Sequence, residues 1–222
     1  MPALQPEQAT TGTIADRESA DGASQPRPRV ASGELTNWLH ERVPHLQERW
    51  LHEIRARGLG QSPAVERVVE MFVTEIVYLL PFVMGRYRDQ MQPLWDCVAE
   101  LFGSIAAKRG LAAGEAIEEI HILRELVIRD LYRDPPLGGK VPLSLREILR
   151  LSRALDRCVT HASVGHTDAM FFQFFGGEEA VDAVNGVDVA AEAEAQLEMV
   201  RSQVQEILEH ATSSTDAGGR KN

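Results

Sequence analysis

The chain has 222 residues, of which 44% are hydrophobic and 25% are charged, enough for one or at most two domains with a buried core. Its 33 Asp and Glu residues against 23 Lys and Arg leave a formal net charge of -10, which disfavours nucleic acid and anionic membranes as partners. The two cysteines, Cys97 and Cys158, form no CxxC motif, which excludes a disulfide scaffold or a thiolate zinc site and predicts a reducing compartment.

Both ends of the chain have the composition of disordered tails. Residues 1–32 are rich in Pro, Ser, Thr, Ala, Gly and Gln, show no hydrophobic periodicity and contain no apolar leader. Residues 213–222 have the same character. No stretch reaches the ~18 uncharged apolar residues that a membrane span requires, so we expect a cytoplasmic protein.

Between the tails, hydrophobic residues recur at helical intervals, which predicts an all-α bundle of about five core helices within residues 33–180. The first helix begins at Ser32 or Gly33, and Pro44 is expected to kink or divide it. The second begins at Ser62-Pro63 and is apolar around most of its circumference, as a central helix is. The other three are expected over residues 93–109, 113–133 and 144–175, with Gly110 ending the first of these and Asp134–Gly139 ending the second.

A last helix, over residues 187–212, differs from the others because it carries a narrow apolar seam. Spacings of three and four residues separate the seam positions, which is typical of a coiled coil. The flanks are acidic, with Arg201 the basic residue among them. This helix therefore either docks on its own bundle or pairs with a second copy, and pairing predicts a homodimer. The seam consists of Ala190, Ala193, Leu197, Val200, Val204, Ile207 and Ala211.

Metal and haem sites have weak candidates in the sequence. One ExxH motif places Glu118 and His121 on one helical face, but di-iron bundles need two such motifs and two further glutamates. Glu75, inside the apolar second helix, is the additional carboxylate considered, and a solvated face is the other interpretation of the motif. His161 and His166 could provide an axial haem ligand, or be hydrogen-bonded at a bundle end. No nucleophile elbow or phosphate loop is present, so we expect neither enzymatic activity nor a cofactor.

Two further features have open interpretations. The segment Phe171–Phe175 is core at the end of the bundle, a ligand-pocket mouth that would suit a small-ligand carrier, or a dimer surface. Arginines form basic stripes on the fourth and fifth helices of an acidic protein. They pair with carboxylates such as Glu119, Glu125 and Asp130 in the same bundle, or they meet an acidic partner surface. These arginines are Arg124, Arg129, Arg133, Arg146, Arg150, Arg153 and Arg157.

A set of short motifs within residues 34–175 resembles the RsbRD N-terminal domain family. They are Arg109-Gly110 followed by Gly114, the run from Glu119 to Leu123-Arg124, the Leu155-Asp156-Arg157-Cys158 sequence, and Trp50 in the first helix. The family consists of all-helical bacterial sensory modules that precede histidine kinase cores or STAS domains. The resemblance implies a non-enzymatic signal-transduction or stress-response module. Because no output domain follows, we expect action in trans on a separate kinase or STAS-type protein.

The motif residues also lead to a physical hypothesis. Glu119 and Arg124 are five positions apart on one helix and do not face each other. We expect Arg124 to reach a carboxylate such as Asp156, and Glu119 to reach Arg109 or Arg153, on neighbouring helices. The alternative function is a cofactor- or metal-binding bundle that uses the glutamate and histidine candidates above.

Overall fold

The computed structural model describes residues 32–57, 63–136, 143–175 and 186–218, and within them all regular secondary structure is helical. The expected all-α bundle is confirmed. Residues 1–31 and 219–222, which include most of the expected tails, lie outside the described residues. The helices are α1 (Ser32–Ala56), α2 (Pro63–Met84), α3 (Arg88–Lys108), α4 (Ala113–Arg133), α5 (Leu145–Phe175) and α7 (Gly186–Gly218).

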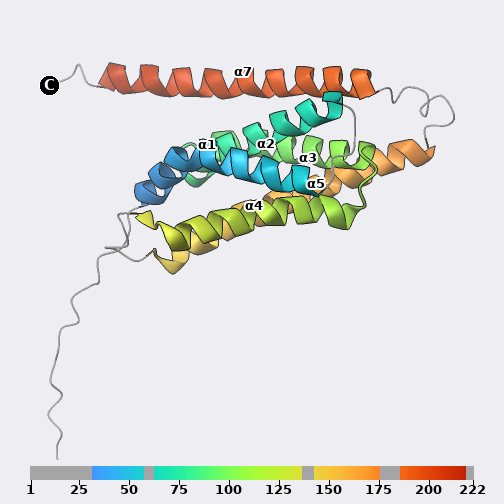
Figure 1. The fold of residues 1–222 in the computed structure, drawn as a ribbon. Coiled ribbons are helices and arrows are strands. Elements are labelled where there is room, and N and C mark those ends of the chain that lie inside the picture. The colour runs from blue at the N-terminus through green and yellow to red at the C-terminus, as the bar shows by residue number, and fades with distance from the viewer. Residues whose placement is uncertain (1–31, 58–62, 137–142, 176–185, 219–222) are drawn as a thin grey trace, which may run out of the picture.

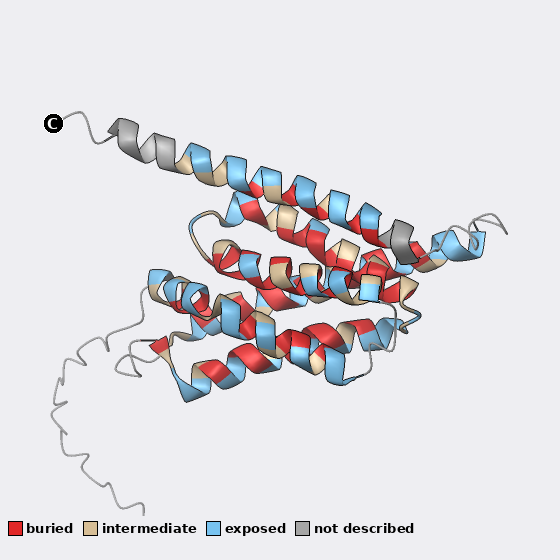
Figure 2. Ribbon diagram, turned by 45° about the horizontal axis from the view of Figure 1, so that its top comes forward, coloured by how far each residue is buried: buried red, intermediate tan, exposed pale blue. Residues whose placement is uncertain are grey.

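The bundle has α3 and α5 in close contact at its centre. Helix α2 packs on α1 and α3, and α4 packs on α5 and α1. Helix α7 lies across α2 and α3, on the side of the bundle opposite α4 (Figure 1). Each core helix directs a buried face inward and an exposed face to solvent (Figure 2). Among the described residues, none of the helices combines the length and apolarity that crossing a bilayer requires.

Two prolines that suggested helix boundaries lie inside helices. Helix α1 runs from Ser32 to Ala56 through Pro44, so of the two expected effects of this proline, a kink or a division, the division is wrong. Leu39 and Leu46, on either side of this proline, are both buried and hold the two halves in one core. Helix α3 begins at Arg88, ahead of the expected start at Pro93, and its early residue Met91 is fully buried. Tertiary burial therefore overrides the local proline signal.

The central α3–α5 contact depends on two glycines. A Cβ atom added to Gly165 would lie 1.8 Å from the carbonyl oxygen of Glu100, and one added to Gly103 would lie 1.8 Å from that of Ala162. Both distances are far below van der Waals contact, so the two backbones touch directly. Only residues without a Cβ atom permit this approach.

Helix α7 docks on its own bundle through the predicted seam. The side chains of Ala190, Ala193, Leu197, Val200 and Val204 are buried in the same hydrophobic cluster as residues of α2 and α3. Figure 2 shows buried residues along the side of α7 that faces the bundle. The seam that led us to expect a homodimer is therefore covered within the chain.

Candidate functional site

The Arg109-Gly110 motif forms the turn that ends α3. Gly110 has a φ of 78°, in the left-handed region that favours glycine. Its N–H donates to Ala107 at 2.9 Å, and the N–H of Leu111 donates to Ala106 at 3.1 Å, which is the Schellman pattern. The carbonyl of Leu111 accepts a bond of 2.8 Å from Nε2 of His166 on α5. The turn is therefore fixed both locally and by a buried side chain.

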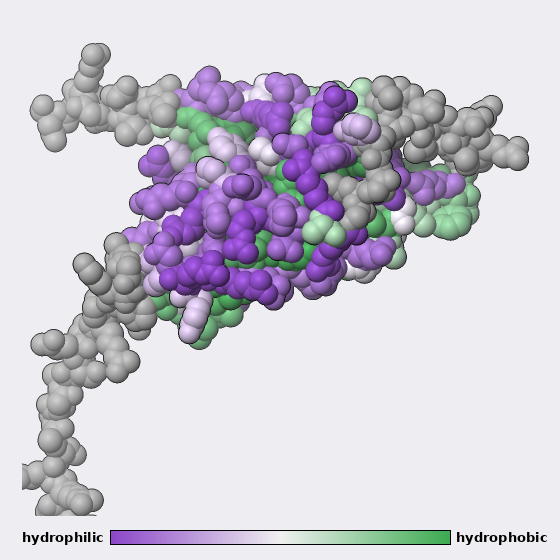
Figure 3. All heavy atoms as spheres, in the orientation of Figure 1, coloured by the Kyte–Doolittle hydropathy of each residue, from purple (hydrophilic) through white to green (hydrophobic). Residues whose placement is uncertain are grey.

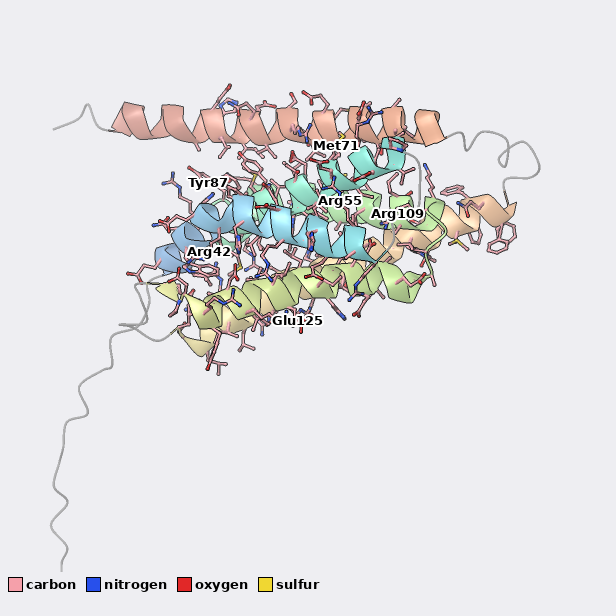
Figure 4. The ribbon with its side chains drawn as sticks, in the orientation of Figure 1. Arg42, Arg55, Met71, Tyr87, Arg109 and Glu125 are labelled. Carbon is pink, nitrogen blue, oxygen red and sulfur yellow. The ribbon has the colours of Figure 1, made fainter. Side chains whose placement is uncertain are left out.

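Arg109 and Glu119 form the most deeply buried ion pair that joins two helices here. The guanidinium donates from two nitrogens to the two carboxylate oxygens, at 2.8 and 2.7 Å, and the side chains are only 4% and 7% exposed. Trp50 of α1 donates from Nε1 to the backbone carbonyl of Glu119 at 2.7 Å. Three helices thus meet at Glu119, and Arg109 lies at the same end of the bundle as the C-terminal part of α1 (Figure 4).

A cavity of about 360 Å³ lies beside this ion pair. Arg57 and Glu118 approach each other at its wall, 3.5 Å apart, and both are about half exposed. Two guanidinium groups and three carboxylates line the cavity, which suits a small polar molecule rather than an anion. The lining residues are Ile54, Arg57, Arg109, Leu111, Gly114, Glu115, Glu118 and Glu119.

The second half of the motif lies farther along α4. Leu123 is fully buried in the core. Arg124 forms an ion pair with Asp156 of α5, as the spacing led us to expect, and Glu119 has Arg109 rather than Arg153 as its partner. The motif residues therefore form two separate ion pairs, one buried at the α3–α4 turn and one at the solvent-exposed α4–α5 seam.

A second polar cluster, which the sequence analysis did not predict, lies between α3 and α5. Asp96 is buried and accepts three bonds of 2.6–2.9 Å from Arg157, which raise the pKa of that guanidinium. Nδ1 of His161 lies 2.7 Å from Glu100. Burial, together with the charge of Asp96, raises the pKa of Cys158 to about 12, so its thiol stays neutral. These contacts join α3 and α5 at the point where Gly103 and Gly165 allow the two helices to approach closely.

An ion pair between α7 and α2 explains the isolated carboxylate of the apolar second helix. Nε of Arg201 donates to Glu75 at 2.5 Å, and the Glu75 side chain is only 7% exposed. A second contact, 3.6 Å between Lys108 and Glu192, joins α3 to α7. In the sequence, Glu75 stands out as an acid within the apolar helix α2, and Arg201 as a base within the acidic helix α7.

The residues considered as metal or haem ligands have protein partners in most cases. Glu75 binds Arg201, and Glu118 faces Arg57 at the surface. His121 is exposed on the same helix as Glu118. His161 and His166 are hydrogen-bonded to Glu100 and to the Leu111 carbonyl. In the part of the chain that the structure describes, no group of three or more His, Cys, Asp or Glu residues has metal-binding geometry.

The phenylalanine-rich segment Phe171–Phe175 is exposed and is not part of the core. Phe171, Phe172, Phe174 and Phe175 are 58–76% exposed, and Phe171 and Phe175 pack on each other with ring centroids 4.3 Å apart. The core interpretation is wrong because α5 continues beyond the helices that cover its middle. The overhanging end is visible in orange at the right of the bundle (Figure 1).

Comparisons of the chain with protein-family models, with curated proteins and with solved structures yield no match.

Proposed function

We propose that this chain is a non-enzymatic signal-transduction module, of the kind that the resemblance to RsbRD N-terminal domains implies, which acts on a separate protein. In this proposal the polar turn at the end of α3 receives or holds the signal, and α7 transmits it. The partner is a kinase or a STAS-type protein.

The observation that carries the proposal is the position of two consecutive residues. Arg109 binds Glu119 of α4 at the polar turn, and Lys108, the residue before it, contacts Glu192 of α7. A change in the geometry of the turn would therefore act at once on the contact that helps to hold α7. The cavity beside Arg109 gives a small molecule access to the same point.

The attachment of α7 is of a kind that can be released. Two of its five buried seam side chains are alanines, so the apolar contribution comes mainly from Leu197, Val200 and Val204, at about 1.5–3 kcal/mol each. Arg201 supplies the specific contact, because an undocked α7 would leave Glu75 without its cation. A signal that weakens this pair shifts α7 toward an undocked state, in which its seam is open to a partner.

The experiment compares wild-type protein with Arg201→Glu, which places a like charge against Glu75 and is expected to release α7. Arg67→Glu is the matched control, because Arg67 is an exposed arginine of α2. Hydrogen exchange measures the release of α7 in each purified variant. Tagged copies expressed in the source bacterium are then isolated, and the proteins recovered with them are quantified by mass spectrometry.

We expect one kinase or STAS-type protein whose recovery changes at least fivefold between wild type and Arg201→Glu and not in the control. Purified together, that protein and this chain should form a complex with the same preference. If α7 is released and the recovered proteins do not change, the proposed function is wrong.

A further inference from the structure

A cavity of about 530 Å³ lies where the first turns of α1 meet the end of α2 and the turn that precedes α3. Its volume is within the range of small-molecule sites, about 300–1,000 Å³. Tyr87, which lines this cavity, and Arg109, which lines the cavity at the polar turn, lie at opposite ends of the bundle (Figure 4). The two cavities are therefore separate. The side chains of this one that bear on binding are Asn37, His40, Phe82, Arg86 and Tyr87.

The lining of this cavity carries a positive charge and, among the described residues, no negative one. Arg86 is the cation, and none of the lining residues is Asp or Glu. The Arg86 side chain forms no hydrogen bond or ion pair with any residue that the structure describes. Acidic residues outnumber basic ones by 33 to 23 in the whole chain, so this lining differs in charge from the rest of the molecule. The cavity therefore favours an anion, and its single cation balances one negative charge.

An aromatic ring holds the Arg86 guanidinium in place. The guanidinium carbon lies 4.6 Å from the ring centroid of Tyr87, so one face of the group is covered while the N–H groups in its plane stay available. Arg42 is stacked on Trp38 in the same way, at 4.3 Å, and its guanidinium binds the carboxylate of Asp134. A ring-stacked arginine of this chain thus already binds a carboxylate. Arg86 has the same arrangement, and the described residues supply no carboxylate to it.

The rest of the lining provides aromatic rings and neutral polar groups. The rings of His40 and Phe82 meet edge to face, with centroids 4.9 Å apart. Partial burial lowers the pKa of the His40 imidazole from 6.5, so this ring is uncharged at neutral pH. The side chains of Asn37 and His40 form no hydrogen bond with the described residues, so each can donate to a ligand or accept from it. Both belong to α1, over which the surface is mainly hydrophilic (Figure 3).

From the unpaired, ring-stacked cation and the aromatic lining we infer that this cavity binds a small aromatic carboxylate. Arg86 holds the carboxylate through parallel N–H groups, and the aromatic part of the ligand lies against Phe82 and Tyr87. A phosphate with two negative charges would leave one charge that Arg86 does not balance, and an aliphatic acid would lack the contacts between rings. The inference goes beyond the proposed function and does not depend on it, because the signalling proposal uses the opposite end of the bundle.

The test uses the full chain and isothermal titration calorimetry, with 2-naphthoate as the probe. One control compound, 2-naphthamide, has the same rings and no charge, and another, decanoate, has the carboxylate and no ring. We expect one molecule of 2-naphthoate to bind per chain, at least tenfold more tightly than either control compound, and to bind less tightly as salt is raised. Inorganic phosphate should not compete with it.

Two pairs of variants separate the contributions of charge and of space. Arg86→Gln should weaken binding of 2-naphthoate about tenfold or more with an unchanged melting temperature, because Arg86 is exposed. Its control is Arg88→Gln, which removes an exposed arginine outside the lining and should leave binding unchanged. Gly33→Leu adds a side chain at the cavity wall, where nothing lies within 4 Å of a Cβ atom, and should also weaken binding about tenfold because it reduces the space for the ring. Gly114→Leu adds the same side chain to an equally open position on α4 and should not affect binding.

Several results would overturn the inference. They are an absence of 2-naphthoate binding, equally tight binding of a control compound, or an affinity that Arg86→Gln leaves unchanged or that Arg88→Gln lowers as much. Nuclear Overhauser effects between the naphthyl protons and the protein locate the bound probe. We expect them at the rings of His40 and Phe82, and effects confined to other residues would also overturn the inference. None of these outcomes depends on the release of α7 by Arg201→Glu, so the cavity and the signalling proposal fail separately.

Discussion

Replacing Gly165 by alanine tests the central packing of the fold. The new Cβ atom would lie 1.8 Å from the carbonyl oxygen of Glu100 and 2.6 Å from its carbonyl carbon. Ordinary carbon–oxygen contacts are about 3.3 Å or longer, so α3 and α5 would have to separate by roughly 1.5 Å at this point. The obstacle is backbone rather than a flexible side chain, and the two helices form the most extensive contact of the bundle.

The expected loss follows from these distances. Overpacking of a well-packed interior costs about 1–3 kcal/mol and occasionally more, and a backbone clash of this depth belongs at the upper end. Alanine recovers about 1 kcal/mol through its higher helix propensity. We therefore expect the free energy of unfolding to fall by about 2 kcal/mol or more, and the melting temperature to fall by roughly 4–8 °C.

Urea denaturation followed by circular dichroism at the helical band measures this loss. The matched control is Gly114→Ala, because nothing lies within 4 Å of a Cβ atom at that position in α4. There we expect unchanged or slightly higher stability, by up to about 1 kcal/mol. If Gly165→Ala were as stable as Gly114→Ala, the close approach of α3 and α5 would be refuted.

Three other predictions concern the ion pairs and the buried thiol. Arg109→Ala should lower the free energy of unfolding by about 3–5 kcal/mol, because Glu119 is left buried without its cation. Arg109→Lys should recover only part of this loss, because lysine cannot donate from two nitrogens in the same plane. A loss below about 1 kcal/mol for Arg109→Ala in a urea titration would contradict the burial of this pair. Arg201→Ala should abolish hydrogen-exchange protection in α7 and leave that of α1 and α4 unchanged, and retained protection in α7 would show that Glu75 does not hold it. Cys158, whose pKa is raised from 9.0 to about 12, should resist alkylation at pH 8 in the native protein while the exposed Cys97 reacts, and equal labelling of the two by mass spectrometry would refute its burial. Since the unfolded thiol loses its proton first, Cys158 contributes stability below pH 9 that disappears as the pH rises toward 12.

Most helix positions could be read from the sequence because they depend on local signals. The Ser144 cap, the Gly110 stop and the Asp134 turn each act within a few residues, and α4 has the expected bounds Ala113–Arg133. A division at Pro44 and a helix start at Pro93 were wrong predictions, because the effect of a proline on a helix depends on how deeply the surrounding residues are buried. A sequence pattern contains no information on that depth of burial until the partner helices are placed.

The candidate site was predictable only in part, for a related reason. Spacing on one helix showed that Glu119 and Arg124 need partners elsewhere, and Arg109 and Asp156 are those partners. Glu75 and Arg201 are separated by 126 positions, and nothing local links them. The phenylalanines at the end of α5 illustrate the opposite error, since apolar character was taken as burial although none of the helices that the structure describes covers them.

All three tryptophans of the chain join two segments through an indole N–H. Trp38 donates to the carbonyl of Asp134 at 2.7 Å, Trp50 to that of Glu119 at 2.7 Å and Trp95 to that of Ile76 at 3.0 Å. These bonds make the tryptophans built-in optical probes of three contacts within the bundle, and none of the three bonds involves α7. Opening of the bundle should therefore change the intrinsic fluorescence, and a signal that moves α7 alone should leave these three bonds intact. Intrinsic fluorescence therefore distinguishes opening of the bundle, which changes it, from release of α7 alone, which leaves these contacts in place.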